Sequence, residues 1–138
     1  MRRDLRTKNF TFNEVAHRPE GLTPDIEPIT YIAMGYLQCL RDAAQFHFKK
    51  QVGITLTSGV RVPAINQTTK GSAANSYHQW RVDKNKQAVW AVDTVPSGIT
   101  LQQWYTFAQQ YVQGEVYLNR KEKIVHIAPY GPDETFVV

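Results

Sequence analysis

The chain has 138 residues, of which 42% are hydrophobic, so it can form one domain over residues 1–138 but is short for two. The formal net charge of +4 is modest and dispersed, and basic residues do not alternate with aromatic ones, so no nucleic-acid partner is expected. No apolar run is long enough to span a membrane, and residues 1–5 lead into no hydrophobic segment, so we expect synthesis in the cytoplasm without a signal peptide.

The N-terminal part is predicted to form an arm followed by one long helix. An arm or short edge strand is expected over residues 1–12, Asn13 is the expected cap of a short helix, and prolines predict a loop over 18–28. The only cysteine, Cys39, falls within the next helical pattern, so a buried, unreactive thiol is expected. That helix should cover about 28–50, because apolar residues recur every three or four positions, at Ile29, Ile32, Ala33, Tyr36, Leu37, Leu40 and Ala44.

Two short strands are predicted after the long helix. The first covers residues 52–57, and the second covers 89–93 and is closed by a turn at 96–98. A polar loop over 62–76 should cross into the region of the site. A second helix is expected over 100–112, with a capping box of Thr100 and Gln103. Its inner face should carry Trp104, Phe107 or Ala108, and Tyr111.

A hairpin should follow, pairing residues 115–118 with 124–128, and residues 135–138 can form a last strand. Short strands interspersed with two helices predict an α+β fold, in which the helices pack on one side of a small, mostly antiparallel sheet.

Two histidines and one aspartate are the candidate metal ligands. His78 lies in a polar loop, Asp93 ends an apolar strand, and His126 lies in the middle of another. A histidine in a strand is more often an ordinary buried side chain, but a carboxylate after an apolar strand needs a partner, either a metal or an arginine. Two imidazoles and one carboxylate can bind zinc and leave a fourth position for water, as in catalytic zinc sites.

Four segments occur in an order that resembles a known family. They are Ile54-Thr55-Leu56-Thr57-Ser58-Gly59-Val60-Arg61, Ser76-Tyr77-His78, Ala91-Val92-Asp93 and Val125-His126. Together they resemble the zinc D-Ala-D-Ala carboxypeptidase and L-Ala-D-Glu endopeptidase superfamily, which cuts peptidoglycan peptides and shares its fold with the Hedgehog signalling domain. In that family a Ser-Gly-Tyr-Arg-Ser segment precedes Ser-x-His, Ala-x-Asp and a strand with a second histidine. The resemblance covers most of the chain.

The resemblance implies a role for each matched residue. His78, Asp93 and His126 would be the ligands of Zn²⁺. Arg61 would stabilise an oxyanion or bind a substrate carboxylate, although a structural ion pair is the alternative for this residue. Ser76 would orient the loop or contact substrate. The implied reaction is metal-assisted hydrolysis of an amide bond.

The chain departs from the family pattern in two ways. Fourteen residues separate His78 from Asp93, which is more than the family has, and the extra stretch of about residues 81–88 is predicted to be a loop or hairpin at the rim of the site. It contains Asp83, a competing ligand that is less favoured because its neighbours are polar. The general base is also open: Glu122 is slightly favoured over Glu115, and a surface role for Glu122 is equally compatible with its flanking lysines.

The expected function is that of a zinc peptidase acting on bacterial cell-wall peptides. A phage-encoded lysin or a virion-associated enzyme would suit the small size, and it would act on the wall after release or as part of a virion. The alternative is a non-catalytic structural or peptide-binding domain on the same fold, such as a virion component. The positive charge is compatible with an anionic wall.

Overall fold

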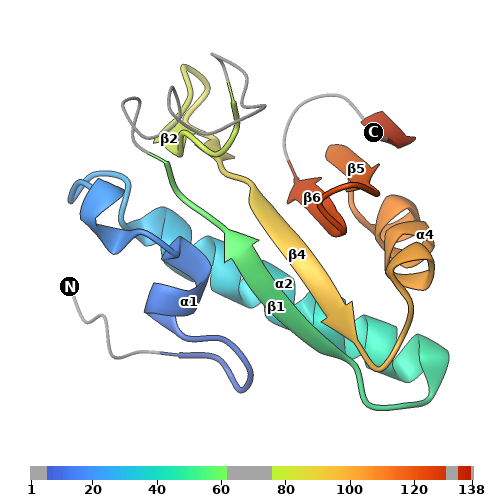
Figure 1. Cartoon of the computed structure of the whole chain (residues 1–138). Helices are drawn as coiled ribbons and strands as arrows, with labels where there is room; N and C mark the ends of the chain where they lie inside the picture. Colours follow the sequence, from blue (N-terminus) through green and yellow to red (C-terminus); the bar gives the residue numbers. More distant parts are fainter. Residues whose placement is uncertain (1–5, 62–75, 130–133, 138) are drawn as a thin grey trace.

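The computed structural model describes residues 6–61, 76–129 and 134–137, and its central feature is a sheet in the order β1-β4-β6-β5-β7 (Figure 1). Neighbouring strands are antiparallel except β5 and β7, which are parallel. This arrangement confirms the predicted α+β class with a mostly antiparallel sheet. The strands are β1 (Gly53–Ser58), β4 (Val92–Ser97), β5 (Glu115–Asn119), β6 (Ile124–Ala128) and β7 (Glu134–Val137).

The helices cover one face of the sheet. The long helix α2 (Pro28–Phe48) runs behind β1 and β4 in Figure 1, and α4 (Leu101–Tyr111) lies beside β5 and β6. Two shorter elements, α1 (Phe12–Ala16) and the 3-10 helix η1 (Pro19–Gly21), precede α2. No helix in the described part of the chain is long and apolar enough to cross a membrane.

Alternation along the strands divides the core from the site. Successive side chains of a strand point to opposite faces, and Val125 and Ile127 of β6 belong to the buried core while His126 between them points to the other face. On the core side, Trp104 of α4 donates its indole N–H to Thr94 Oγ1 at 2.8 Å, and that hydroxyl donates to the Val125 carbonyl at 2.8 Å. The core therefore fixes β4 and β6 against α4.

The predicted helix caps are partly confirmed. Thr100 caps α4, with Gln103 as its partner. At α1 the predicted cap Asn13 is wrong, because Thr11 accepts the backbone N–H of Glu14 while the Glu14 carboxylate accepts the N–H of Thr11. This reciprocal pair satisfies two amide groups that would otherwise lack partners, so the helix begins earlier than predicted.

The strand predicted over residues 89–93 lies further along the chain. Val89 pairs instead with Arg81, in a hairpin of β2 (Arg81–Val82) and β3 (Ala88–Val89), which confirms the predicted hairpin in the inserted stretch. Asp93 is therefore near the start of β4 rather than at its end. Pro96 is tolerated within β4 because β6 pairs with this strand only from Val92 to Thr94.

Three expectations about burial are wrong. Ile32 is predicted on the apolar face of the long helix but is 53% exposed. Cys39 is exposed, because it lies about 200° around the helix from the buried Leu37 at a helical step of about 100° per residue. The side chain of Tyr111 is 55% exposed at the last turn of α4, where it stacks on Phe107 rather than entering the core.

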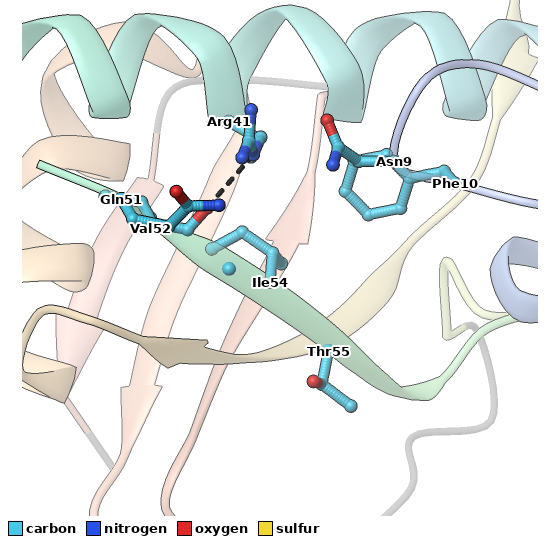
Figure 2. Close-up of a pocket in the computed structure, with 8 residues that line it drawn as sticks. Asn9, Phe10, Arg41, Gln51, Val52, Ile54 and Thr55 are labelled. Atoms are coloured by element: carbon cyan, nitrogen blue, oxygen red, sulfur yellow. Dashed lines mark hydrogen bonds between the residues drawn. The ribbon is translucent and has the colours of Figure 1, made fainter.

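A pocket of about 210 Å³ lies between α2 and the edge strand β1 (Figure 2). The buried Arg41 donates its Nε–H to the Val52 carbonyl at 3.0 Å and so ties the helix to the start of β1. None of the predicted site residues lines this pocket, whose wall consists of Asn9, Phe10, Arg41, Gln51, Val52, Gly53, Ile54 and Thr55.

Gly59 lies where α1 packs closely on the end of β1, and Gly35 in α2 serves as its control. A Cβ atom at Gly59 would lie 2.3 Å from the Val15 carbonyl oxygen, whereas one at Gly35 in α2 would meet nothing within 4 Å. We expect Gly59→Ala to lower the free energy of unfolding by about 1–3 kcal/mol through this overpacking. Gly35→Ala should raise it by about 0.5–1 kcal/mol through helix propensity. Denaturant titration of both variants measures the difference, and equal stabilities would contradict the close approach.

Candidate metal centre

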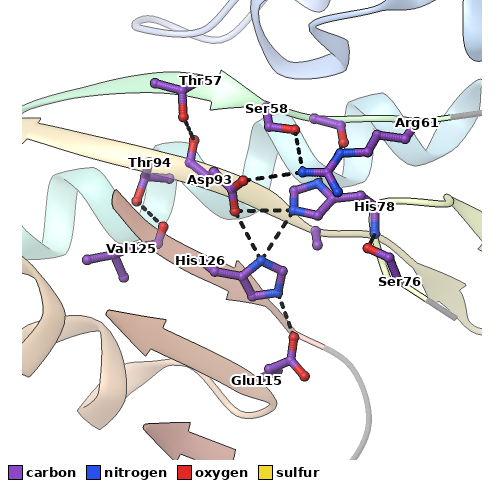
Figure 3. A network of polar contacts seen from close by, with 12 residues as sticks. Thr57, Ser58, Arg61, Ser76, His78, Asp93, Thr94, Glu115, Val125 and His126 are labelled. Carbon is purple, nitrogen blue, oxygen red and sulfur yellow. Dashed lines mark hydrogen bonds and ion pairs between the residues drawn. The ribbon is translucent and has the colours of Figure 1, made fainter. Parts of the chain in front are cut away.

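The sheet places two of the three predicted ligands side by side. Asp93 of β4 and His126 of β6 are direct partners in the antiparallel register, so their side chains lie on the same face. His78 reaches the same point from the segment that precedes β2, as Figure 3 shows. The structure therefore brings together residues that are up to 48 positions apart in the sequence.

The three donor atoms form a nearly equilateral triangle. His78 Nε2 lies 3.2 Å from Asp93 Oδ1 and 3.2 Å from His126 Nδ1, and His126 Nδ1 lies 3.1 Å from Asp93 Oδ1. Ligand atoms bound tetrahedrally to zinc at their usual bond lengths are about 3.3 Å apart. The side chains of both histidines are 3% exposed, and that of Asp93 is 14% exposed. These three residues could hold a metal ion.

The proton on His78 is placed by a backbone carbonyl. His78 Nδ1 lies 2.8 Å from the Gly59 carbonyl oxygen, which can only accept, so Nδ1 carries the proton and donates it. In the neutral ring, Nε2 then presents a bare lone pair to Asp93 and His126. The backbone of His78 is held as well, because its N–H donates to Ser76 Oγ at 3.1 Å and its carbonyl accepts the N–H of Arg61 at 2.6 Å.

The second histidine is held on its opposite edge. His126 Nε2 lies 2.6 Å from Glu115 Oε1, a distance at which a nitrogen lone pair and a carboxylate oxygen need a proton between them. The contact is short but is not aligned as an ideal hydrogen bond. The Tyr117 ring stacks on the imidazole at a centroid distance of 4.3 Å and an interplanar angle of 10°.

Burial and charge set the protonation of the cluster. Burial opposes the ionised form of Asp93, but its contacts with His126 and His78 outweigh this and hold the pKa of the carboxyl well below its usual range. Burial lowers the pKa of His78. It acts the same way on His126, but Asp93 and Glu115 together raise the pKa of that ring. His126 is therefore the histidine that keeps an added proton more readily, and a divalent cation bound by the three donors would displace any proton on its Nδ1.

Arg61 lies on the outer side of Asp93. Its Nη2 is 3.6 Å from Asp93 Oδ2 and 3.2 Å from Ser58 Oγ, and its side chain is 12% exposed. The arginine therefore contacts the carboxylate oxygen that does not face the histidines. Burial lowers the pKa of Arg61, while Asp93 opposes this change. Burial also raises the pKa of the nearby Tyr117 to about 12, with a further contribution from Asp93, so this phenol is neutral near pH 7.

The remaining predicted site residues differ in whether they contact the histidines. Ser76 orients the backbone of His78, in line with one of its two expected roles. Glu115 contacts the cluster, but Glu122 is exposed in the turn between β5 and β6, where its backbone N–H binds Asn119 Oδ1. Asp83 is occupied at the tip of the β2–β3 hairpin, where it accepts the backbone N–H groups of Asn85 and Gln87. Asp93 is thus the carboxylate that joins the histidines.

Sequence reasoning missed two contributors to the site. Gly59 acts through its carbonyl group, which no side-chain pattern can indicate. Tyr117 could have been found from the hairpin, because it is the register partner of His126 on β5. Residues 62–75 of the loop predicted over 62–76 lie outside the described part of the chain, so the expected passage of this loop near the site stays a prediction.

Comparison with protein-family models, with curated proteins and with solved structures found no match. The resemblance to the zinc peptidases therefore stays a prediction from the sequence.

Proposed function

We propose that this protein is a zinc-dependent peptidase that hydrolyses amide bonds in peptidoglycan peptides, with His78, Asp93 and His126 as the metal ligands. One observation carries the proposal: the bare Nε2 of His78, the Nδ1 of His126 and a carboxylate oxygen meet at 3.1–3.2 Å in a buried site. Such a set needs positive charge at its centre, which a proton or a metal ion can supply. Two nitrogen donors and one oxygen donor suit zinc, and three protein ligands leave a position for water or substrate.

The residues around the cluster support hydrolysis of an amide. Bound zinc would polarise a carbonyl group and lower the pKa of a bound water. Arg61, held by Ser58 beside Asp93, is placed to bind negative charge, either on a reacting carbonyl oxygen or on a substrate carboxylate. A sheet with helices on one face and ligands on the other is compatible with the Hedgehog-type fold that we propose. A phage lysin or virion component is the proposed setting.

A second candidate function is favoured by the position of the glutamates. Glu115 is engaged with the far edge of His126, and Glu122 is exposed in a turn. Neither one contacts the donor triangle itself in the described residues, whereas a general base must reach the metal-bound water. A non-catalytic domain that uses a metal for structure or for peptide binding would need no such base.

A digestion assay separates the two candidates. Purified peptidoglycan is incubated with the zinc-loaded protein, with the chelator-treated protein and with the chelated protein after zinc is restored, and released peptides are identified by mass spectrometry. The peptidase predicts new amine and carboxyl ends that disappear with the chelator and return with zinc. Zinc at one ion per chain without any cleavage would reject the peptidase and favour the binding domain.

A further inference from the structure

We propose that Glu115 is a positioning residue that determines which nitrogen of His126 faces the metal, and that it is not the general base. This inference rests on the proposed metal site. It changes the role of Glu115 from a group that reacts with water to one that acts through a ligand.

The register of the hairpin puts Glu115 within reach of His126. Tyr117 is the direct partner of His126, and Glu115 is two residues before it on β5, so all three side chains are on the same face. Glu115 is thus the diagonal neighbour of His126, a separation that a long side chain can bridge. Its carboxylate reaches Nε2, at the opposite edge of the ring from Nδ1, which faces Asp93 and His78.

A carboxylate at Nε2 has two effects on the ring. It keeps a proton on Nε2, which leaves Nδ1 as the nitrogen that can bind a metal. It also makes Nδ1 a stronger donor, as in the carboxylate–histidine–metal arrangement of many metal sites. His78 differs, because its second nitrogen donates to the neutral carbonyl of Gly59. Of the two histidines, His126 is therefore the one that Glu115 contacts.

The burial of the Glu115–His126 contact and the stacking of Tyr117 favour a positioning role for Glu115. The side chain of Glu115 is 23% exposed and that of His126 is 3% exposed, so their contact is largely shielded from water. Tyr117 stacks on the ring from the same strand, which fixes the ring plane while Glu115 fixes its edge.

The test is the zinc affinity of Glu115 variants, measured by competition with a chromophoric chelator. We expect Glu115→Ala to bind zinc about 10–100-fold more weakly than the unmodified protein, the range for loss of such a partner. Glu115→Gln should lose less, because its amide oxygen can still accept the Nε2 proton but lacks the charge. Glu20→Ala, at an exposed glutamate in η1, is the matched control and should bind normally.

Long-range ¹H–¹⁵N NMR of the zinc-loaded protein gives a second readout. The unmodified protein and Glu115→Gln should show His126 protonated on Nε2 and metal-bound through Nδ1, while Glu115→Ala should weaken this preference. Circular dichroism checks that each variant is folded. If Glu115→Ala does not fold, the near-isosteric Glu115→Gln variant still tests the inference.

The outcomes separate this inference from the proposed function. If the unmodified protein binds no zinc, both fail. If it binds zinc and both Glu115 variants keep its affinity and NMR pattern, only the positioning role fails. Unchanged affinity with loss of peptide cleavage would make Glu115 a residue of the chemistry itself and would also overturn the inference.

Discussion

Replacing His126 with alanine should abolish stoichiometric zinc binding. The variant removes one of three donors and leaves the Asp93 and Glu115 carboxylates without their shared partner. Loss of a donor should weaken affinity by more than the roughly 100-fold upper range for outer-shell partners. Metal analysis after dialysis should find about one zinc per chain in the unmodified protein, from the open three-ligand site, and none above background in the variant. Peptide cleavage should be lost with the metal.

Two further variants separate loss of a ligand from loss of folding or of any histidine. Asp93→Asn preserves the shape of the side chain but removes its charge, so it should also lose zinc while disturbing the packing less than His126→Ala does. His17→Asn is the histidine control, because His17 is exposed at the end of α1 and is not one of the proposed ligands. Normal zinc content in His126→Ala and Asp93→Asn would eliminate the proposed ligand set.

Zinc should also stabilise the folded protein strongly against heat. An ion that binds only the folded state at 1,000 times its dissociation constant adds about 4 kcal/mol. For a domain of this size that corresponds to a rise in Tm of about 10–20 °C. Scanning calorimetry of the metal-free and zinc-loaded protein measures the shift, and chelator should reverse it. His126→Ala should show little of it, and a Tm that zinc leaves unchanged in the unmodified protein would contradict a specific buried site.

Much of the fold could be predicted because local patterns agree with tertiary packing. The periodicity of residues 28–50 predicted α2, the Thr100–Gln103 pair predicted the start of α4, and alternation predicted the β5–β6 hairpin. The error in the second strand came from its pairing. Val89 fits a strand by composition, but its partner is Arg81 in a local hairpin, so β4 begins only at Val92.

The identity of the three candidate ligands could be predicted from the sequence, but the groups that orient them could not. His78, Asp93 and His126 were indicated by residue type and order, and the structure brings them together. Their orientation depends on groups that the sequence does not single out, namely the Gly59 carbonyl and a glutamate on the neighbouring strand. Glu122 was slightly favoured because it is closer to His126 in the sequence, but the hairpin turn directs the chain away, and register rather than sequence distance decides which side chains meet.

The pairing of β4 with β6 brings two of the three proposed ligands together without the help of a metal ion. Two donors become neighbours as soon as these strands align, because Asp93 and His126 are register partners whose side chains meet at 3.1 Å. Unlike a zinc finger, which stays unfolded without its metal, we expect this domain to fold before it binds the proposed cation. On the proposed function, newly made protein would then be a folded but inactive apoprotein that gains activity when zinc is supplied.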